Sequence, residues 1–427
     1  YTYPIDGDGM IHAVYLREGK ASYRNRFIET KGLLAERRAG KALYGGISNI
    51  VMPDPKLIGK NGDKGPTKNG AFVHVIRHAK QYIALMETST AYQISSDLLT
   101  VGEWTPKGMK APPNVNAHTR LDPKTQQLHL FTYNFAEPEI SYYILNKQGE
   151  IIKNIVIEKE YSTMIHDFVI TEHYIIFFDG PAIFDMNKLA TGEPVLSWQP
   201  QLGTRIGVMK KKNLKIDWID TETFFVYHFA NAYEDGERII VNYTRHESLR
   251  LGGEIKSSNN KHPCFYQTRI NLSTHEVAHE VLDHHSTEFP RINDNYNSMP
   301  YQYSYMVARE KEDNPSHNAI LKYDSKKREK VLHLFGDDHE VGEPVFAPKL
   351  KPKSEDDGYI MLFVYNKKKK SSCFVILDAK CLDNKPLAEI QLPRASMQNF
   401  QEYPRADQPR QRPAAIPCRR RQPLRMR

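Results

Sequence analysis

GYIMLFVYN at residues 358–366 and CFVILDA at residues 373–379 are two β-branched and aromatic runs separated by the polar segment KKKKSS. Runs of this kind, bounded by turn residues, predict two neighbouring β-strands. The pattern recurs along the chain to about residue 391, and few segments show helical periodicity. Further runs are YIALM (82–86), LHLFTYNF (128–135), ISYYIL (140–145), YIIFFD (174–179), RIIVNYT (238–244) and YQYSYMVA (301–308). The sequence therefore predicts an all-β protein.

Several predicted strands end in an apolar residue followed by Asn, Asp or Ser at the start of a polar turn. These pairs are Ile94-Ser95, Leu145-Asn146, Phe184-Asp185, Ile219-Asp220, Ile270-Asn271, Tyr323-Asp324 and Leu377-Asp378. Without the weaker Ile219-Asp220, the intervals are 39 to 54 residues, and one interval of 86 residues is about two periods. Such a period is typical of four-stranded β-propeller blades, which must stack to bury their faces. Seven pairs predict about seven blades, with a pair of irregular β-sandwiches as the alternative.

The composition is that of a globular protein, with 40% hydrophobic and 11% aromatic residues. No stretch approaches the run of about 18 apolar residues expected of a membrane-spanning helix. The cysteines Cys264, Cys373, Cys381 and Cys418 are too few and too irregularly spaced for a disulfide scaffold or a CxxC metal site. The sequence therefore predicts a reducing, cytoplasmic environment.

The net charge of +8 comes almost entirely from the C-terminal segment. Residues 392–427 hold nine Arg, no Lys, six Pro and two acidic residues, whereas residues 1–391 hold 50 basic and 49 acidic residues. We therefore expect a propeller over residues 1–391 and an irregular Arg- and Pro-rich segment over residues 392–427. This distribution predicts no nucleic-acid partner. Binding of a nucleic acid or another anionic surface through Arg419, Arg420 and Arg421 is the alternative.

Three histidines lie in or beside apolar, strand-like segments. They are His118 in NVNAHTRLDP, His166 in STMIHDFVIT and His228 in FFVYHFANAYEDG. A neutral imidazole in such a segment needs a partner. Equivalent positions on successive propeller blades face one central axis, where three imidazoles can surround a metal ion. Taken one at a time, each is more simply explained as a hydrogen-bonded core or surface histidine.

Six motifs occur in an order and spacing that resemble the carotenoid cleavage oxygenase family, which includes apocarotenoid oxygenases, retinoid isomerases and lignostilbene dioxygenases. The motifs are GDGMIHAVYLREGKASYRNRF (7–27), AHTRLDP (117–123), MIHDFVIT (164–171), YHFANAYEDG (227–236), EFPRIN (288–293) and GEPVFAP (342–348). The resemblance covers about residues 5–391. It implies a seven-bladed propeller with Fe(II) on its axis, four histidine ligands, and a dome of helices and loops over the metal.

By this resemblance, His118, His166 and His228 take three of the ligand positions. The family also has three glutamates that accept hydrogen bonds from the outer nitrogens of ligand histidines. Neutral imidazoles suit Fe(II), and an N–H donated to a carboxylate fixes the tautomer and aims the ring. The glutamates at the matching positions are Glu87, Glu288 and Glu343.

The fourth histidine is where the sequence departs from the family pattern. The family places it near the C-terminus, in a GFHG-like segment shortly after an LP that ends a strand. Here AEIQLPR (388–394) matches the approach, but the Arg- and Pro-rich segment follows it and no histidine comes after His339. We therefore expect three histidine ligands and a weakened iron site.

The resemblance implies a dioxygenase that uses O₂ to cleave a conjugated C=C bond into two carbonyl products. Lignostilbene-type members hold a substrate phenol with a Tyr and a Lys, and that Lys directly precedes the first outer glutamate. Met86 stands there in this chain. A thioether packs against a polyene but cannot stabilise a phenolate. We therefore expect a carotenoid or apocarotenoid substrate and peripheral membrane contact, with a phenolic stilbene dioxygenase or a noncatalytic propeller as alternatives.

Overall fold

The computed structural model describes residues 7–46, 51–60, 62–65, 68–191, 193–249, 262–393 and 415–416. Most of these residues lie in short antiparallel strands, which confirms the predicted all-β class. The described helices are α1 (Lys31–Ala39), α2 (Pro55–Ile58) and the 3-10 segments η2 (Met186–Ala190), η3 (Pro200–Leu202) and η4 (Asp294–Tyr296). Apart from its first two residues and the strand β32 (Ala415–Ile416), the Arg- and Pro-rich segment lies outside the described residues.

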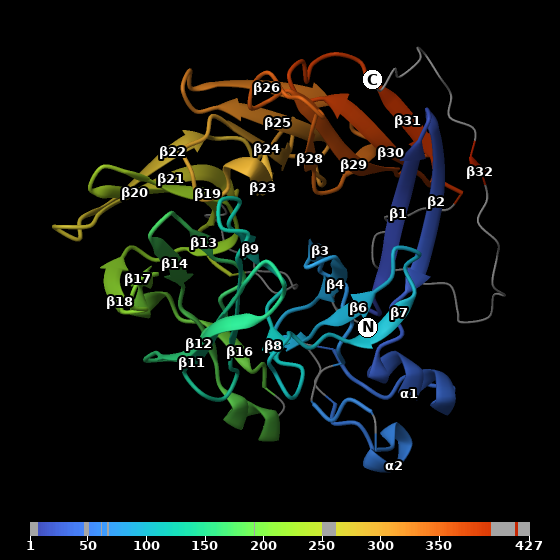
Figure 1. The fold of residues 1–427 in the computed structure, drawn as a ribbon, viewed down its shortest axis with the longest axis vertical. Coiled ribbons are helices and arrows are strands. Elements are labelled where there is room, and N and C mark those ends of the chain that lie inside the picture. The colour runs from blue at the N-terminus through green and yellow to red at the C-terminus, as the bar shows by residue number, and fades with distance from the viewer. Residues whose placement is uncertain are drawn as a thin grey trace.

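Six antiparallel sheets, numbered here as blades 1 to 6 in chain order, form a propeller (Figure 1). Blade 1 comprises β3 (His74–His78), β4 (Gln81–Leu85), β6 (Tyr92–Ile94) and β7 (Thr100–Glu103); blade 2 comprises β9 (Arg120–Leu121), β10 (Leu128–Tyr133), β11 (Glu139–Leu145) and β12 (Ile151–Glu158). Blade 3 comprises β13 (Val169–Ile170), β14 (Tyr174–Asp179), β17 (Thr204–Lys210) and β18 (Ile216–Thr221); blade 4 comprises β19 (Phe225–Asp235), β20 (Arg238–His246), β21 (Cys264–Asn271) and β22 (Val277–Asp283).

Blade 5 comprises β23 (Thr287–Arg291), β24 (Tyr303–Ala308), β25 (Ala319–Asp324) and β26 (Glu329–Leu334). In blade 6, both β27 (His339–Val341) and β28 (Val345–Pro348) pair with β29 (Gly358–Asn366), and β30 (Ser371–Asp378) and β31 (Ala388–Gln391) follow. Three smaller sheets of the described residues lie outside the blades. One contains the hairpin of β1 (Met10–Arg17) and β2 (Lys20–Phe27) together with β32, and the other two are the pairs β5 (Ser89–Thr90) with β8 (Asn114–Val115) and β15 (Ala182–Phe184) with β16 (Leu196–Trp198).

The polar residues that follow the predicted strands close the turns between strands. Oδ1 of Asn146 accepts hydrogen bonds from the backbone N–H groups of Gln148 and Glu150, both at 3.0 Å. A short Asn or Asp side chain stabilises a turn by bonding to the backbone two or three residues on. The side chains of Asn271, Asp324 and Asp378 likewise accept hydrogen bonds from the backbone N–H groups two and three residues further on. The repeated pairs in the sequence are therefore turn signals.

These turn signals also explain why the sequence pattern counts seven blades where the described residues form six. Five of the seven pairs end the third strand of a blade, at β6, β11, β21, β25 and β30. The other two, Phe184-Asp185 and Ile219-Asp220, both belong to the region of blade 3. One ends the side strand β15 and the other lies in the outer strand β18. The pattern thus counts blade 3 twice.

The hairpin β1–β2 lies between the first and last blades (Figure 1). Ile11 packs with Ile94 of blade 1, and Tyr23 packs with Ile390 of blade 6. The hydroxyl of Tyr15 also donates to the carbonyl of Ser96 at 2.6 Å, in the turn that follows β6. β2 also pairs with β32. The hairpin therefore joins the two ends of the row of blades.

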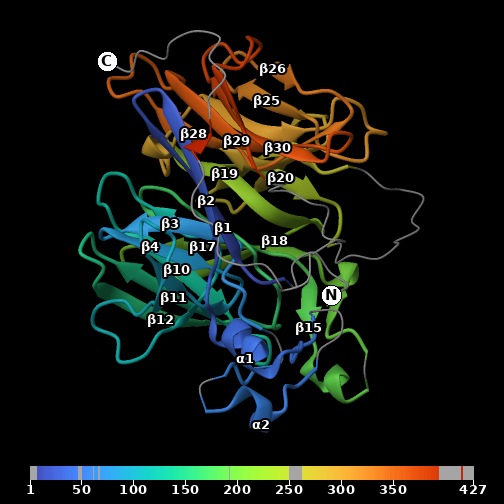
Figure 2. The same cartoon turned by 90° about the vertical axis from the view of Figure 1, so that its right-hand side faces the viewer.

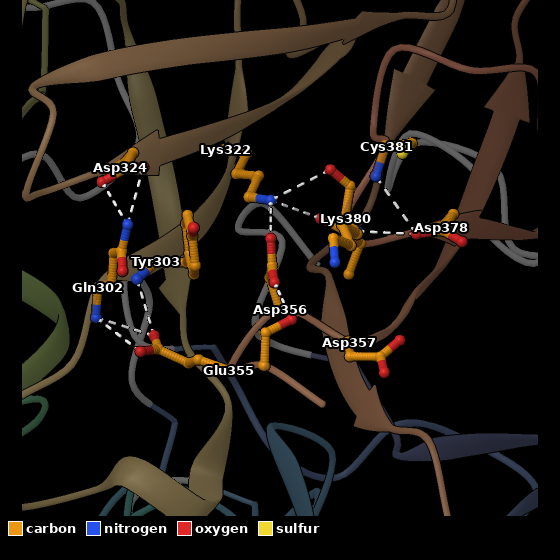
Figure 3. Close-up of polar contacts among 12 residues, drawn as sticks. Gln302, Tyr303, Lys322, Asp324, Glu355, Asp356, Asp357, Asp378, Lys380 and Cys381 are labelled. Atoms are coloured by element: carbon orange, nitrogen blue, oxygen red, sulfur yellow. Dashed lines mark hydrogen bonds and ion pairs between the residues drawn. The ribbon is translucent and has the colours of Figure 1, made fainter. Parts of the chain in front are cut away.

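A buried ion pair connects blades 5 and 6 (Figure 3). Nζ of Lys322 donates to Oδ2 of Asp356 at 2.7 Å and to the carbonyl of Ala379 at 2.9 Å. The ammonium lies 4.3 Å from the centre of the Tyr303 ring. Glu355 accepts the backbone N–H of Tyr303 at 2.8 Å. Since Lys322 and Tyr303 belong to blade 5 and Ala379 follows β30 of blade 6, this network holds two neighbouring blades together.

The helices α1 and α2 lie together at one end of the molecule (Figures 1 and 2). Thr30 caps the N-terminus of α1, where its hydroxyl accepts the N–H of Leu33, and Gly40 caps the C-terminus with a left-handed backbone. The two helices pack through Ala35 and Ile58. Among the described residues, no helix has the length and apolar character needed to cross a bilayer.

Candidate metal centre

The three predicted histidines converge from three neighbouring blades. His118 and His166 lie just before β9 and β13, the first strands of blades 2 and 3, and His228 lies in β19, the first strand of blade 4. One ring nitrogen of each lies within 4.8 Å of the other two. The Nε2 atoms of His118 and His166 are 3.0 Å apart. The sequence predicted that these three residues would face one axis from successive blades, and their positions agree with that prediction.

The local backbone turns these side chains toward one another. The β19–β20 ladder shifts register between Val226 and Phe229, so His228 lies in an irregular part of the strand. Such a bulge redirects a side chain that regular pairing would place elsewhere. Asn116 fixes the segment before β13, since its Nδ2 donates to the carbonyls of Ile165 at 3.0 Å and His166 at 2.7 Å.

A buried ionic layer joins the same three strands beside the histidines. Nη2 of Arg120 lies 2.5 Å from Oδ2 of Asp167, and Nε of Arg120 donates to the carbonyl of Phe168. Oδ2 of Asp167 also accepts the N–H of Phe229 at 3.0 Å. Because Arg120, Asp167 and Phe229 each lie one or two positions from a site histidine, this layer fixes how the three strands meet.

Two of the three predicted glutamates face the site histidines. Oε2 of Glu87 lies 2.8 Å from Nδ1 of His166, and Oε2 of Glu288 lies 2.7 Å from Nδ1 of His228. A carboxylate at this position accepts the Nδ1 proton, which leaves Nε2 as the unprotonated nitrogen. In both histidines Nε2 is therefore the nitrogen that can bind a metal ion.

Glu343, the third predicted glutamate, has a different partner. Its Oε1 accepts a hydrogen bond from Nε of Arg291 at 2.6 Å, and Nη2 of Arg291 lies 2.5 Å from the same oxygen. Among the described residues, no hydrogen bond joins Glu343 to His118, His166 or His228. Met86 is half-buried beside Glu87, and its Sδ accepts the N–H of Gly70 at 3.0 Å.

Burial and neighbouring charges shift the pKa values of these groups in different directions. Burial, followed by the neighbouring His166 and His228, lowers the pKa of His118 well below its usual value. Burial alone would raise the pKa of Glu288, but His228 and His246 together hold it below its usual range. Burial alone would lower the pKa of His166, whereas the Glu87 carboxylate raises it. The centre thus contains a neutral His118 between two histidines that are backed by carboxylates.

The donor set fits a divalent transition metal. Imidazole nitrogens bind Fe, Co and Zn, and metal–nitrogen distances of about 2.0–2.1 Å allow two ligands of one ion to lie about 3 Å apart. The 3.0 Å between Nε2 of His118 and Nε2 of His166 agrees with that spacing. Without a bound cation, the same distance suits a hydrogen bond between the two Nε2 atoms, with a neutral His118 donating to His166.

Sequence reasoning missed three residues that bind the outer carboxylates. The hydroxyl of Tyr133 donates to Oε1 of Glu87 at 2.8 Å, and Nε2 of His246 lies 2.5 Å from Oε1 of Glu288. Arg291 is the third. Tyr133 and His246 lie in ordinary strand-like runs with no motif of their own, and Arg291 lies inside the EFPRIN motif, where its charge could have been noticed.

Comparison with known proteins agrees with this site. The family model of the retinal pigment epithelial membrane protein matches residues 1–400. The chain belongs to this family. The predicted resemblance to the carotenoid cleavage oxygenases is thereby confirmed, because curated members of that group match over nearly the whole chain.

Two curated relatives illustrate the range of activities among similar proteins. The carotenoid 9,10(9',10')-cleavage dioxygenase 1 of Phaseolus vulgaris is 29% identical over 93% of this chain and 80% of its own length. The isoeugenol monooxygenase of Pseudomonas putida is 26% identical over 91% of this chain and 85% of its own length. Both therefore align with most of this chain.

Solved structures from the family share the fold. The lignostilbene dioxygenase of Pseudomonas brassicacearum superimposes with a TM-score of 0.83 at 26% identity, over 91% of this chain and 85% of that chain. A cobalt-substituted apocarotenoid oxygenase of Synechocystis gives the same TM-score at 26% identity, over 92% of this chain and 86% of that chain. These structures support the β-propeller architecture.

Proposed function

We propose that this chain is a non-haem Fe(II) dioxygenase that cleaves a conjugated C=C bond of a carotenoid or apocarotenoid with O₂, giving two carbonyl products. The observation that carries the proposal is the convergence of His118, His166 and His228, two of which are backed by glutamates. Family membership and the named activity of the Phaseolus vulgaris relative support the same reaction class.

In this proposal the three histidines hold the iron, and Glu87 and Glu288 keep His166 and His228 in the tautomer that presents Nε2. Bound Fe(II) would supply the activation of O₂ next to the alkene. The protein's own contribution is to fix the imidazoles, exclude bulk water and align the double bond. We also propose that Glu343 supports the metal centre from outside the histidines, through its hydrogen bond with Arg291.

We also infer that residues 1–391 act as one propeller unit in which the hairpin β1–β2 takes the place of a seventh blade. The short pairs β5–β8 and β15–β16 would contribute to a dome over the metal. β5 directly follows the Glu87 segment, and Ile183 of β15 bridges to Thr163, three residues before His166. Both pairs are thus anchored beside residues of the metal centre.

A phenolic substrate is the second candidate. The names of an isoeugenol monooxygenase and a lignostilbene dioxygenase among the similar proteins favour it. Met86 counts against it, because a thioether cannot pair with a phenolate oxygen, whereas it packs well against a polyene. The polyene substrate is therefore the one we propose.

We further propose a cytoplasmic protein that touches a membrane through its helical end. Leu34 of α1, Leu57 of α2 and Met52 are 37%, 40% and 62% exposed. Lys56 and Lys60 are exposed in the same segment. Exposed apolar side chains next to basic ones suit the surface of an anionic bilayer, where the polyene would be dissolved.

The reaction is tested by incubating the iron-loaded chain with apocarotenals and with phenolic stilbenes under ¹⁸O₂. We expect labelled aldehyde or ketone products from the apocarotenals and slower or no turnover of the stilbenes. Preferred cleavage of the stilbenes would select the second candidate. Absence of labelled carbonyl products from both classes, with iron shown to be bound, would contradict the proposed activity and favour a noncatalytic propeller.

A further inference from the structure

Glu288 has a second histidine partner that the family pattern did not suggest. Its Oε2 accepts bonds from Nδ1 of His228 at 2.7 Å and from the N–H of Phe289 at 2.6 Å. Its Oε1 faces Nε2 of His246 at 2.5 Å. Glu288 is only 8% exposed, so water has little access to either oxygen. The carboxylate is therefore held on both sides by protein donors.

His246 is well placed to restrain this carboxylate. It ends β20, where it pairs with Phe225 across the ladder, so it lies beside the strand that carries His228. Its side chain is 15% exposed, and its ring packs edge-on against Tyr227 at 5.0 Å between centroids. A carboxylate gripped through one oxygen can still rotate, whereas a donor on the other oxygen fixes its plane.

Glu87 shows the same arrangement, and Glu343 shares only the outer donor. Tyr133 donates to Oε1 of Glu87, while Oε2 of Glu87 faces His166. Arg291 donates to Oε1 of Glu343. Each outer carboxylate thus has a protein donor on Oε1, and Glu87 and Glu288 also face a site histidine through Oε2. The repetition of the full arrangement at Glu87 and Glu288 indicates that these donors belong to the construction of the centre.

We propose that His246 is a positioning residue of the metal centre. Through Glu288 it fixes the plane of the carboxylate that holds the His228 ring, and so keeps Nε2 of His228 directed at the metal. The inference rests on the proposed metal-binding function. The proposed role requires a hydrogen-bond donor at Nε2 of His246. A substitution that keeps the donor can therefore distinguish this role from simple packing.

The test compares His246→Gln with His246→Leu. The Gln amide can donate from nearly the position of the imidazole Nε2, whereas Leu fills much of the volume with no donor. The probe is Co(II), added to the metal-free full chain in competition with a chelator, together with the visible absorption bands of bound Co(II). Loss of an outer hydrogen-bond partner changes metal affinity by roughly 10- to 100-fold. His246 is one contact further from the metal than Glu288, so we expect His246→Leu to lower the Co(II) affinity by about tenfold.

We expect His246→Gln to keep the affinity within about twofold and to keep the Co(II) spectrum, whereas His246→Leu shifts both. In a Glu288→Gln background, His246→Leu should have little further effect, since the two residues act through one contact. The matched control is His173→Leu, which removes a surface histidine bonded to Glu234 at 2.8 Å and should change nothing. If the Leu variant does not fold, His246→Met replaces it.

Unchanged Co(II) affinity and spectrum in a folded His246→Leu or His246→Met variant would overturn the inference. An equal loss of Co(II) affinity in His246→Gln would also overturn it, because the effect would then come from packing and not from the hydrogen-bond donor. A wild-type chain that binds no Co(II) would instead contradict the proposed metal centre itself, so the two failures are distinguishable.

Discussion

Glu288 has partners on both of its oxygens, and its substitution tests the outer carboxylates at the scale of one residue. Glu288→Gln keeps the size of the side chain but replaces one acceptor oxygen by an NH2 group, so the side chain can accept the proton of His228 or of His246 but not of both. Loss of such a partner lowers metal affinity by roughly 10- to 100-fold, and we expect that decrease here.

The measurement is metal affinity by chelator competition, with thermal unfolding of the metal-free chain to show that the fold persists. Glu234→Gln is the control, because Glu234 lies in the same strand as His228 but bonds to the exposed His173 rather than to a site histidine. Equal affinity in Glu288→Gln and wild type would remove Glu288 from the site.

At this scale the sequence predicted the site residues that lie in a recognisable motif, and it did not predict those that lie outside one. His118, His166 and His228 could be selected because each interrupts an apolar strand-like run. His246 could not, because it comes two residues after the run RIIVNYT (238–244), like any polar residue at a strand end. Its role depends on the contact with Glu288, which lies 42 positions further along the chain. Such a contact exists only once the blades are packed.

At the scale of elements, the contact between blades 5 and 6 depends on the buried pair of Lys322 and Asp356. Both side chains are less than 10% exposed. Lys322→Met keeps the stem and removes the ammonium, which leaves Asp356 and the carbonyl of Ala379 without that donor. Removing one partner of a buried pair costs about 3 kcal/mol or more, so we expect a loss of about 3 kcal/mol in the free energy of unfolding.

The effect should depend on pH. Burial alone would raise the pKa of Asp356, but the hydrogen bonds from Lys322 and Ser354 lower it below its usual value. A carboxyl with a lowered pKa in the folded state stabilises the fold above its unfolded pKa of about 3.9, and this contribution is lost as the pH falls through the folded pKa. The difference between wild type and Lys322→Met should therefore be full at pH 7 and shrink below about pH 4.

Denaturant unfolding at several pH values measures this difference, with Lys349→Met as the matched control. Lys349 pairs with Asp357 at 2.6 Å but is 36% exposed, so its removal should cost less than about 1 kcal/mol. Equal losses in the two variants, or a loss in Lys322→Met that persists undiminished in acid, would contradict the account of the buried pair.

Strands were easier to predict than blades. The run YIIFFD and all but the last residue of CFVILDA lie in β14 and β30, because β-branched and aromatic runs bounded by polar turns are local signals. The number of blades depends instead on which strands pair. Phe184-Asp185 ends a strand that pairs with β16 outside the blades, and nothing local distinguishes it from a pair that ends a blade strand.

At the scale of the whole molecule, the helical end should determine membrane binding. Transfer of one apolar side chain from water is worth about 1.5–3 kcal/mol when it is fully buried. We therefore expect the combined variant Leu34→Ser, Met52→Ser and Leu57→Ser to reduce binding to anionic vesicles at least about tenfold. The measurement is co-sedimentation with the vesicles.

The control replaces two equally exposed residues of blade 1, Leu99→Ser with Val101→Ser. These side chains are 53% and 61% exposed and lie on or beside the outer strand β7. They should leave vesicle binding unchanged. If the helical variant binds as well as wild type, the membrane-facing surface lies elsewhere or is absent.

The ring as a whole brings together histidines that are 48 and 62 positions apart in the chain, and every other functional expectation depends on that convergence. The direct test is anaerobic titration of the metal-free full chain with Fe(II), beside His228→Ala and the exposed His173→Ala. We expect one tightly bound Fe(II) ion per chain in wild type and in His173→Ala, and loss of this ion in folded His228→Ala. A wild-type chain with no tight site, or a His228→Ala variant that retains it, would contradict the metal centre.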